Sequence, residues 1–301
     1  MTARIARLLL TLLLVSFLTA CGERQTRKAE EAYLPSTPLD FLPALKGDYF
    51  RLDSEIVGRP YHIYVRYPEG YEQSPEREYP VIYLLDGDSL FPILAANHLF
   101  LHYDDKIPEA IVVGIAYGGF DPATNWRDVD FSTKWAERAR SGGVEDFHRF
   151  VERELLPAVE TRYRVDATRR VLYGQSRGGF MVLYSAFNHP DLFWGRVAGN
   201  PSLLPHPEQF YAEPAKAARS DLRLVVSSAT EDRYKENRER TLDWYSHWRA
   251  RDNAPWNIYL NTIEGGTHAA NSTDIYRYAL RELFQDEIMQ AQQDADATAQ
   301  H

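Results

Sequence analysis

The feature that most constrains this chain is a glycine–x–serine–x–glycine turn at residues 174–178. It follows a short apolar run, residues 170–173, that is typical of a buried strand. It precedes a longer apolar run, residues 179–187, that is typical of a helix. Such a turn is tight, because glycines leave free the space that Cβ atoms would fill, and it exposes the serine at the end of the strand. The sequence therefore predicts Ser176 as a nucleophile, and the alternative is a serine in an ordinary structural turn.

Residues 1–20 predict a signal peptide that is removed from the mature chain. Arg4 and Arg7 make its start positive, and the apolar run 8–18 is too short for an ordinary membrane-spanning helix. The run ends in Leu-Thr-Ala-Cys, which resembles the lipobox of bacterial lipoproteins, where the cysteine is lipidated and becomes the first mature residue. Cys21 is the only cysteine, so it has no intrachain disulfide partner. We expect lipidation at Cys21, and the alternative is a soluble secreted protein that is cut just before it.

Lipidation at Cys21 predicts that the protein is anchored in the bacterial cell envelope and faces the periplasm. No Asp follows Cys21 at the second mature position, which by resemblance to enterobacterial sorting slightly favours the outer membrane. Residues 21–38 are charged and polar and predict a lipidated tether, whereas residues 286–301, rich in Gln, Asp and Ala, predict a disordered tail or a frayed helix end. Residues 39–285 between them suit one domain.

Within this domain, short apolar runs alternate with helical patterns. Residues 80–85 and 110–116 are continuous apolar runs, as in strands that are covered on both faces, and residues 144–163 carry apolar side chains at helical spacing. Further strands are expected at residues 48–52, 59–67, 171–173, 222–227 and 256–262, and a closing helix at residues 272–285. This alternation predicts an α/β fold with a mostly parallel sheet flanked by helices.

A nucleophilic serine needs a base, and the base needs a carboxylate that orients it. In sheets of this kind the order along the chain is serine, acid, histidine. His268 lies between the last predicted strand and the closing helix, so it is the predicted base; the alternative is a helix-capping or solvent-facing histidine. The acid is expected just after the strand at 222–227, where Glu231 is the first choice and Asp232 the second. If both are surface carboxylates, a dyad of Ser176 and His268 remains.

The negative charge that develops on an ester oxygen needs two backbone N–H donors. One is predicted at Arg177, directly after the serine, and the other at Gly87 or Asp88, in the turn after the strand at 80–85. The alternatives for the Asp-Gly-Asp turn are an ordinary turn or a carboxylate pair that binds a cation.

Composition and the remaining motifs argue against other classes. The net charge of −9 speaks against a nucleic-acid binder. His98 and His102 stand four apart and could share a metal on a helix, but no Glu follows His98 as in H-E-x-x-H sites. We therefore expect neither a metal nor an organic cofactor.

Taken together, seven segments resemble the putative-esterase branch of the α/β-hydrolases, which includes esterase D-like and enterochelin esterase-like proteins. The matching segments are residues 64–71, 79–88, 150–159, 174–179, 189–193, 199–203 and 265–268. The resemblance spans about residues 49–284 and implies an α/β-hydrolase fold and hydrolysis of esters of periplasmic small molecules, siderophore esters among them.

The same resemblance implies two further points. Residues 127–130 match an Arg-x-x-Asp segment that precedes the substrate pocket, which places Trp126 and Arg127 at the substrate. Arg127 would then hold a carboxylate or an acidic siderophore; the alternative is a salt bridge to Asp128 or Asp130. The strand end before the expected acid departs from the family because it lacks a glycine.

The residues and the resemblance together predict a lipid-anchored serine esterase that acts on a small-molecule ester. Two alternatives stay open: an acyltransferase that uses the same serine, and a hydrolase-like binding lipoprotein without activity. The sequence leaves the oligomeric state and the acyl and alcohol parts of the substrate undetermined.

Overall fold

The structure is a computed structural model that describes residues 42–299. The predicted signal peptide at 1–20, the lipidation site at Cys21 and the tether at 21–38 therefore lie outside the described residues. Within 42–299, no helix combines the length and the hydropathy that a membrane crossing requires.

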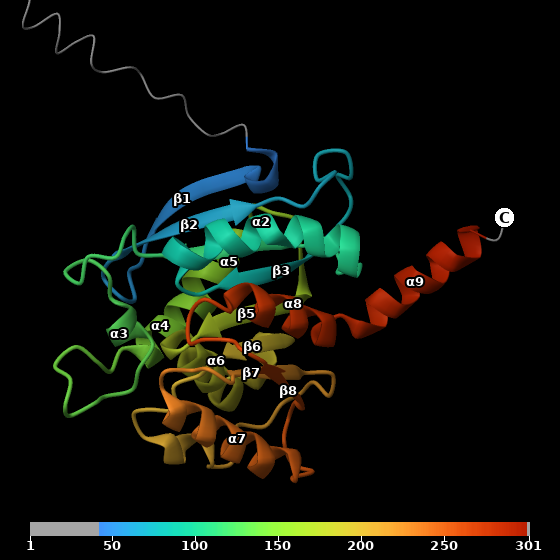
Figure 1. Cartoon of the computed structure of the whole chain (residues 1–301). Helices are drawn as coiled ribbons and strands as arrows, with labels where there is room; N and C mark the ends of the chain where they lie inside the picture. Colours follow the sequence, from blue (N-terminus) through green and yellow to red (C-terminus); the bar gives the residue numbers. More distant parts are fainter. Residues whose placement is uncertain (1–41, 300–301) are drawn as a thin grey trace, which may run out of the picture. The chain divides into compact units, whose positions relative to one another are not determined.

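An eight-stranded sheet forms the centre of the domain, in the order β1-β2-β4-β3-β5-β6-β7-β8 (Figure 1). The first pairings, β1 with β2 and β2 with β4, are antiparallel, and all the others are parallel. The strands are β1 (Gly47–Asp53), β2 (Pro60–Arg66), β3 (Tyr79–Leu84), β4 (Ile111–Ala116), β5 (Val165–Gln175), β6 (Gly195–Gly199), β7 (Arg223–Ala229) and β8 (Asn257–Ile263). The predicted α/β architecture with a mostly parallel sheet is confirmed.

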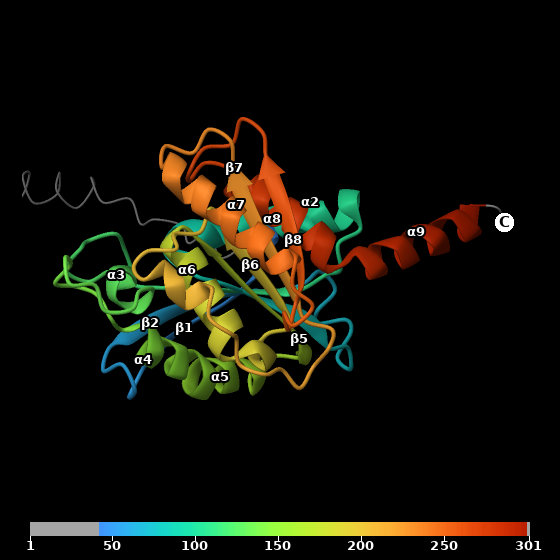
Figure 2. The same ribbon diagram turned by 90° about the horizontal axis from the view of Figure 1, so that it is seen from below.

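Helices cover both faces of the sheet (Figures 1 and 2). They are α2 (Gly87–Asp105), α3 (Arg127–Asp130), α4 (Val144–Phe150), the π-helical turn η2 (Val151–Leu155), α5 (Leu156–Glu160), α6 (Arg177–Asn188), α7 (Lys235–Arg249), α8 (Ser272–Leu283) and α9 (Gln285–Ala299), with short 3₁₀ turns η1 (Pro43–Leu45), η3 (Pro190–Leu192) and η4 (Pro207–Phe210). Side chains of one strand alternate between the layers: Ile82 and Leu84 join the apolar cluster of α2 and α8, whereas Val81 and Tyr83 join that of α4, α6 and α7. Each face of the sheet thus has its own buried core.

Two parts of this layout differ from the expected pattern. The helix expected at 144–163 is interrupted by η2 and ends at Glu160. Strand β6 was not expected, because its five residues include Arg196, a charged residue in the middle of a buried strand. The two Nη groups of its guanidinium donate to the carbonyl oxygens of Ser185, His189, Pro190 and Phe193, whereas its Nε has no partner among residues 42–299. These hydrogen bonds offset most of the cost of burying the charge.

Residues 286–299 form α9, so the helical alternative for this segment describes them and the predicted disordered tail is wrong there. Ile288 is buried in the apolar cluster of α8, and Asp286 and Glu287 pair with Arg223 and Arg169. These contacts fix the first turn, and the Gln and Ala residues that follow favour helix by their intrinsic propensity.

The parallel strands β5, β6, β7 and β8 end at the same edge of the sheet, because parallel neighbours run in one direction. The loops that follow them carry Ser176, Asn200, Asp232 and His268. Residues far apart in sequence are thereby gathered at one edge, where ligand sites of open α/β sheets lie.

Candidate active site

Ser176 lies between the last residue of β5 and the first residue of α6, with φ 60° and ψ −114°. A positive φ is unfavourable for a residue with a side chain, so the surrounding backbone must hold it. The Ser176 N–H donates to Gly199 O at 2.8 Å, and its carbonyl accepts from Ser202 N–H at 3.0 Å. The serine hydroxyl is thereby held in a turn of fixed geometry at the edge of the sheet.

The two glycines of the turn differ in what they permit. A Cβ atom at Gly174 would lie 2.4 Å from the carbonyl oxygen of Gly178, a backbone atom that cannot move aside. A Cβ atom at Gly178 would first meet Asp86 Oδ2, at 3.4 Å, which is an ordinary contact. Close approach of β5 and α6 therefore requires the first glycine more strictly than the second.

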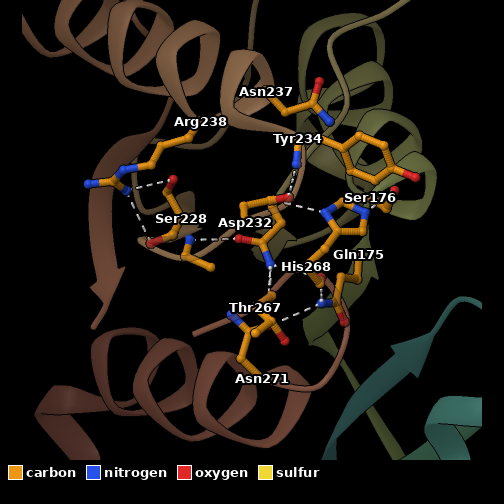
Figure 3. Close-up of polar contacts among 12 residues, drawn as sticks. Gln175, Ser176, Ser228, Asp232, Tyr234, Asn237, Arg238, Thr267, His268 and Asn271 are labelled. Carbon is orange, nitrogen blue, oxygen red and sulfur yellow. Dashed lines mark hydrogen bonds and ion pairs between the residues drawn. The ribbon is translucent and has the colours of Figure 1, made fainter. Parts of the chain in front are cut away.

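His268 connects the serine to a carboxylate (Figure 3). Its Nε2 lies 2.9 Å from Ser176 Oγ, and its Nδ1 lies 2.8 Å from Asp232 Oδ2. A carboxylate only accepts hydrogen bonds, so the neutral ring that satisfies both contacts carries its proton on Nδ1. Nε2 is then free to accept the proton of the serine hydroxyl, which is the arrangement a general base needs.

Glu231, the first choice for the acid, is wrong as the partner of His268, because that contact is made by Asp232. The Glu231 N–H donates to Gly266 O at 2.9 Å and its side chain is exposed, whereas Asp232 is buried. The second oxygen of Asp232 accepts the Tyr234 N–H at 2.8 Å, which holds the carboxylate toward the histidine. Neighbouring residues in this loop point in different directions, and their order after β7 does not reveal which one turns inward.

The backbone of His268 is held by amide side chains that the sequence does not single out. The carbonyl oxygen of His268 accepts Gln175 Nε2 at 2.6 Å and Asn200 Nδ2 at 3.0 Å. Both amides also reach Asn271 Oδ1, at 3.2 Å each, and Asn200 Oδ1 accepts the Ala229 N–H at 2.8 Å. Asn200 therefore connects the end of β7 to the histidine loop. The only signal in the sequence was the position of Asn200 within the matching segment 199–203.

The three predicted oxyanion donors lie at helix starts. Arg177 is the first residue of α6, and Gly87 and Asp88 are the first two of α2. N–H groups in a first helical turn have no partner inside the helix, so they are free to bind an anion. The side chain of Asp88 has a separate role, since it accepts the N–H groups of Tyr117 and Gly118 at 2.7 and 2.9 Å. The Asp-Gly-Asp turn is thus tied to the end of β4.

Arg127 makes a contact that the sequence did not predict. Its Nε and Nη2 bind the two carboxylate oxygens of Asp86 at 2.7 and 3.0 Å, and the nearest approach to Asp128 is 3.8 Å. This fork-to-fork pair fixes the residue before Gly87, which adopts a left-handed conformation with φ 54°. The guanidinium carbons of Arg59 and Arg140 lie 4.9 and 4.3 Å from the centre of the Trp126 ring. Trp126 lines neither of the two cavities at Ser176.

Helix α3, which carries Arg127, is anchored by the buried carboxylate of Asp130. It accepts hydrogen bonds from Arg59 and from the hydroxyls of Tyr61 and Tyr117, the latter two at 2.7 and 2.9 Å. Burial raises the pKa of Asp130 to about 6, and the charge and hydrogen bonds of these partners oppose that rise. The anchor keeps the arginine beside the Asp-Gly-Asp turn.

Two cavities share Ser176 and His268 in their walls. The first, about 320 Å³, has Leu90, Ile93 and Phe120 in its wall, and we call it the apolar cavity. The second, about 530 Å³, is lined by Arg138, Arg177 and Arg233, beside Trp135 and Tyr234, and we call it the arginine-lined cavity. Because their linings differ in this way, the two cavities favour different chemical groups.

His98 and His102, the two histidines that could share a metal on a helix, are engaged in hydrogen bonds. His98 is fully buried, with Nδ1 3.0 Å from Tyr276 Oη and Nε2 3.0 Å from Pro108 O. His102 Nδ1 lies 2.8 Å from Ile107 O. Both nitrogens of His98 are thus used inside the fold.

Comparisons with known proteins agree on one family. The family model described as "Putative esterase" matches residues 54–282. Ferri-bacillibactin esterase BesA of Bacillus subtilis is 34% identical over 169 residues, which cover 50% of this chain and 57% of that protein. Apo-salmochelin esterase of Escherichia coli is 27% identical over 204 residues, which cover 62% of this chain and 61% of that protein. The chain thus spans about three fifths of the curated relatives that it matches.

Solved structures share the fold. An IroE-like serine hydrolase from Shewanella oneidensis superposes with a TM-score of 0.70 at 25% identity, covering 80% of this chain and 81% of that chain. The BES protein from Bacillus cereus has a TM-score of 0.70 at 19% identity, covering 83% and 98%.

Proposed function

Because the chain belongs to the putative esterase family, we propose that it is a serine esterase whose nucleophile is Ser176. The observation that carries the proposal is the chain of hydrogen bonds from Ser176 Oγ to His268 Nε2 and from His268 Nδ1 to Asp232 Oδ2. Serine, acid and histidine also follow in the order of α/β-hydrolases, with the acid after β7 and the histidine after β8.

The reaction proceeds in two acyl-transfer steps. Ser176 Oγ attacks the ester carbonyl carbon while His268 Nε2 takes the hydroxyl proton, and the same nitrogen then protonates the departing alcohol. A water molecule attacks the acyl-enzyme by the reverse sequence and releases the carboxylic acid. Asp232 keeps the proton on Nδ1 and stabilises the imidazolium ion that forms in both steps. The N–H groups of Arg177 and of Gly87 or Asp88 stabilise the oxyanion.

We assign a siderophore ester as the substrate class. The relatives named above are a ferri-bacillibactin esterase and an apo-salmochelin esterase, and the arginine-lined cavity supports the same class for this chain. Guanidinium groups bind anionic oxygens through paired hydrogen bonds and stack on aromatic rings, so they suit a phenolate-bearing, aromatic ligand. The apolar cavity then takes the less polar part of the ester.

The substrate assignment is tested by comparing a catecholate siderophore triester with p-nitrophenyl acetate, which is small and uncharged. Arg138→Gln and Arg233→Gln should each lower kcat/KM for the siderophore by about ten- to a hundredfold, the value of a charge-assisted hydrogen bond. Hydrolysis of p-nitrophenyl acetate should be unchanged. Arg240→Gln is the matched control, since Arg240 pairs with Glu236 on the surface of α7.

Equal losses on both substrates would show that these arginines support the site itself and would overturn the siderophore assignment. An organophosphonate adduct at Ser176 without hydrolysis of any ester would instead favour acyl transfer to another acceptor.

We also propose that the protein is anchored in the cell envelope through lipid on Cys21, faces the periplasm and is sorted to the outer membrane. Support comes from the apolar run 8–18, the lipobox-like end at residues 18–21 and the polar tether that follows. Stable anchoring requires more than one acyl chain, as bacterial lipoproteins carry. Mass spectrometry should find lipid on Cys21, and Cys21→Ala should leave the chain unprocessed or released. An unlipidated wild-type chain in the membrane fraction would contradict the proposal.

A further inference from the structure

Three side chains that can ligate a metal meet at the end of α6 opposite Ser176. His148 comes from α4, Glu152 from η2, and His189 directly follows α6. One ligand atom from each lies within 4.8 Å of the other two, and the imidazole rings of His148 and His189 stack with their centroids 4.0 Å apart. The three belong to different elements, so the fold rather than a local motif brings them together.

The clearest sign of a missing ligand is an unsatisfied nitrogen. His148 is only 1% exposed, and its Nδ1 has no hydrogen-bond partner among residues 42–299. The other ring nitrogen, Nε2, lies 3.4 Å from Ser185 Oγ, so Nδ1 is the atom left free. A buried polar atom without a partner costs about 1–3 kcal/mol, and a bound cation would supply the partner.

The charges around the cluster partly balance. Arg196 is the nearby cation, and its two Nη groups donate to backbone carbonyl oxygens rather than to the cluster. The carboxylate of Glu152 provides the negative charge that a divalent ion needs.

The side of the cluster formed by Glu152 and His189 opens to a cavity of about 390 Å³. Tetrahedral zinc with bonds of about 2.0–2.1 Å needs ligand atoms about 3.4 Å apart, so the three groups have to approach by at most about 1.4 Å. Glu152 is only partly buried and can approach by rotating its side chain. His189, which is also partly buried, has to turn out of its stack on His148, because two nearly parallel rings cannot aim their in-plane lone pairs at one ion.

We propose that His148, Glu152 and His189 form a binding site for a divalent transition metal of the zinc type, with water from the cavity as the fourth ligand. Two histidines and one carboxylate with an open position are a known zinc ligand set. The metal would tie the α4–η2 segment to the end of α6, the helix that begins at Arg177. The site lies apart from the proposed esterase residues, so its role is structural.

The test is titration of the full chain, stripped with a chelator, with zinc ions alone, followed by calorimetry and by thermal unfolding. We expect one equivalent per chain and a higher Tm with zinc. Glu152→Gln and His189→Gln should each weaken the zinc affinity by more than about tenfold. Loss of a group that only hydrogen-bonds to a metal ligand already weakens metal affinity by about ten- to a hundredfold, and loss of a ligand itself should cost more. Both residues reach the surface, so these variants should fold, and the Tm in chelator verifies this. The buried His148 is left unchanged for that reason.

His206→Gln is the matched control, because His206 also lies beside a glutamate, Glu208 at 3.2 Å, but is exposed and outside the cluster. Its zinc affinity should equal that of the wild type. Absence of stoichiometric zinc binding, or wild-type affinity in both Glu152→Gln and His189→Gln, would overturn the proposal. All three variants should retain full esterase activity. Failure of the zinc-binding proposal would therefore not bear on the proposed esterase function.

Discussion

Ser176 and His268 make contact at 2.9 Å, but the backbone around each is held in a different way. The serine turn is fixed by its immediate neighbours: it joins β5 to α6 directly, and Gly174 lets the two elements approach. The histidine loop is fixed from a distance, by the amide groups of Gln175 and Asn200 on its carbonyl oxygen. Ser176 is therefore positioned by local backbone, and His268 by long-range side-chain contacts. Substitutions of the catalytic side chains should remove a reacting group, whereas substitutions of the supporting amides should only displace the histidine.

The largest effects are expected where the two regions meet. Ser176→Ala and His268→Ala should each lower kcat by about a millionfold, and the double variant should be no worse, because members of a catalytic unit are strongly non-additive. Initial rates on an activated ester and on a siderophore ester measure this. A His268→Ala variant with wild-type kcat would show that His268 is not the base.

The next effect separates neighbours in the acid loop. Asp232→Asn should lower kcat by about 10⁴-fold, since an amide NH2 group can donate to Nδ1 and thereby favours the tautomer with the proton on Nε2. Glu231→Gln should stay near wild type, because its side chain is exposed and the contact with His268 is made by Asp232. The reverse result would return the acid role to Glu231.

A smaller effect tests the long-range support of the histidine loop. Asn200→Ala removes the amide that joins His268 O to the Ala229 N–H, so the base should lose its exact position while the serine turn remains. We expect kcat to fall by about ten- to a hundredfold, as for supporting groups around other active-site ligands, with little change in KM. Asn200 is a positioning residue, and Asn188→Ala at the exposed end of α6 is the control.

Steady-state kinetics on Asn200→Ala and Asn188→Ala measure the two values of kcat and KM. A wild-type kcat in Asn200→Ala would show that the loop is rigid without the amide.

The same contrast explains what the sequence could predict. The turn at Ser176 is encoded by consecutive residues, and the continuous apolar runs encode the central strands, so both were found. The order of strands then placed His268. Asp232 was only the second choice, because the direction of a side chain in a loop depends on contacts with Tyr234 and the histidine ring. Asn200 and Gln175 were missed, since nothing near them in sequence reveals a partner about 70 to 90 residues away.

The smallest effect concerns the support behind the histidine loop. His98 binds Tyr276 of α8, the helix that begins four residues after His268. Burial lowers the pKa of His98 to about 3, below the ordinary value of 6.5, and the nearby Arg66 adds to this. Between these two pH values the unfolded chain binds one proton more than the folded chain. The stabilising contribution is therefore present above pH 6.5 and is lost as the pH falls toward 3.

His98 alone should lower the free energy of unfolding by about 1.4 kcal/mol per pH unit below pH 6. His98→Gln should reduce that slope, although its stability at pH 7 will be lower. Urea unfolding at pH 7 and at several lower pH values measures the slope, and the exposed His206→Gln is the control. An unchanged slope in His98→Gln would show that another group causes the loss at low pH.

The proposed esterase depends above all on Ser176 being a nucleophile that His268 and Asp232 activate. Reaction of the full chain with a fluorophosphonate tests this directly, with peptide mass spectrometry to locate the adduct and the rate of labelling to measure activation. We expect one adduct, on Ser176, that is absent in Ser176→Ala, forms far more slowly in Asp232→Asn and forms at the wild-type rate in Glu231→Gln. An adduct on another residue, or labelling that persists in Ser176→Ala, would contradict it.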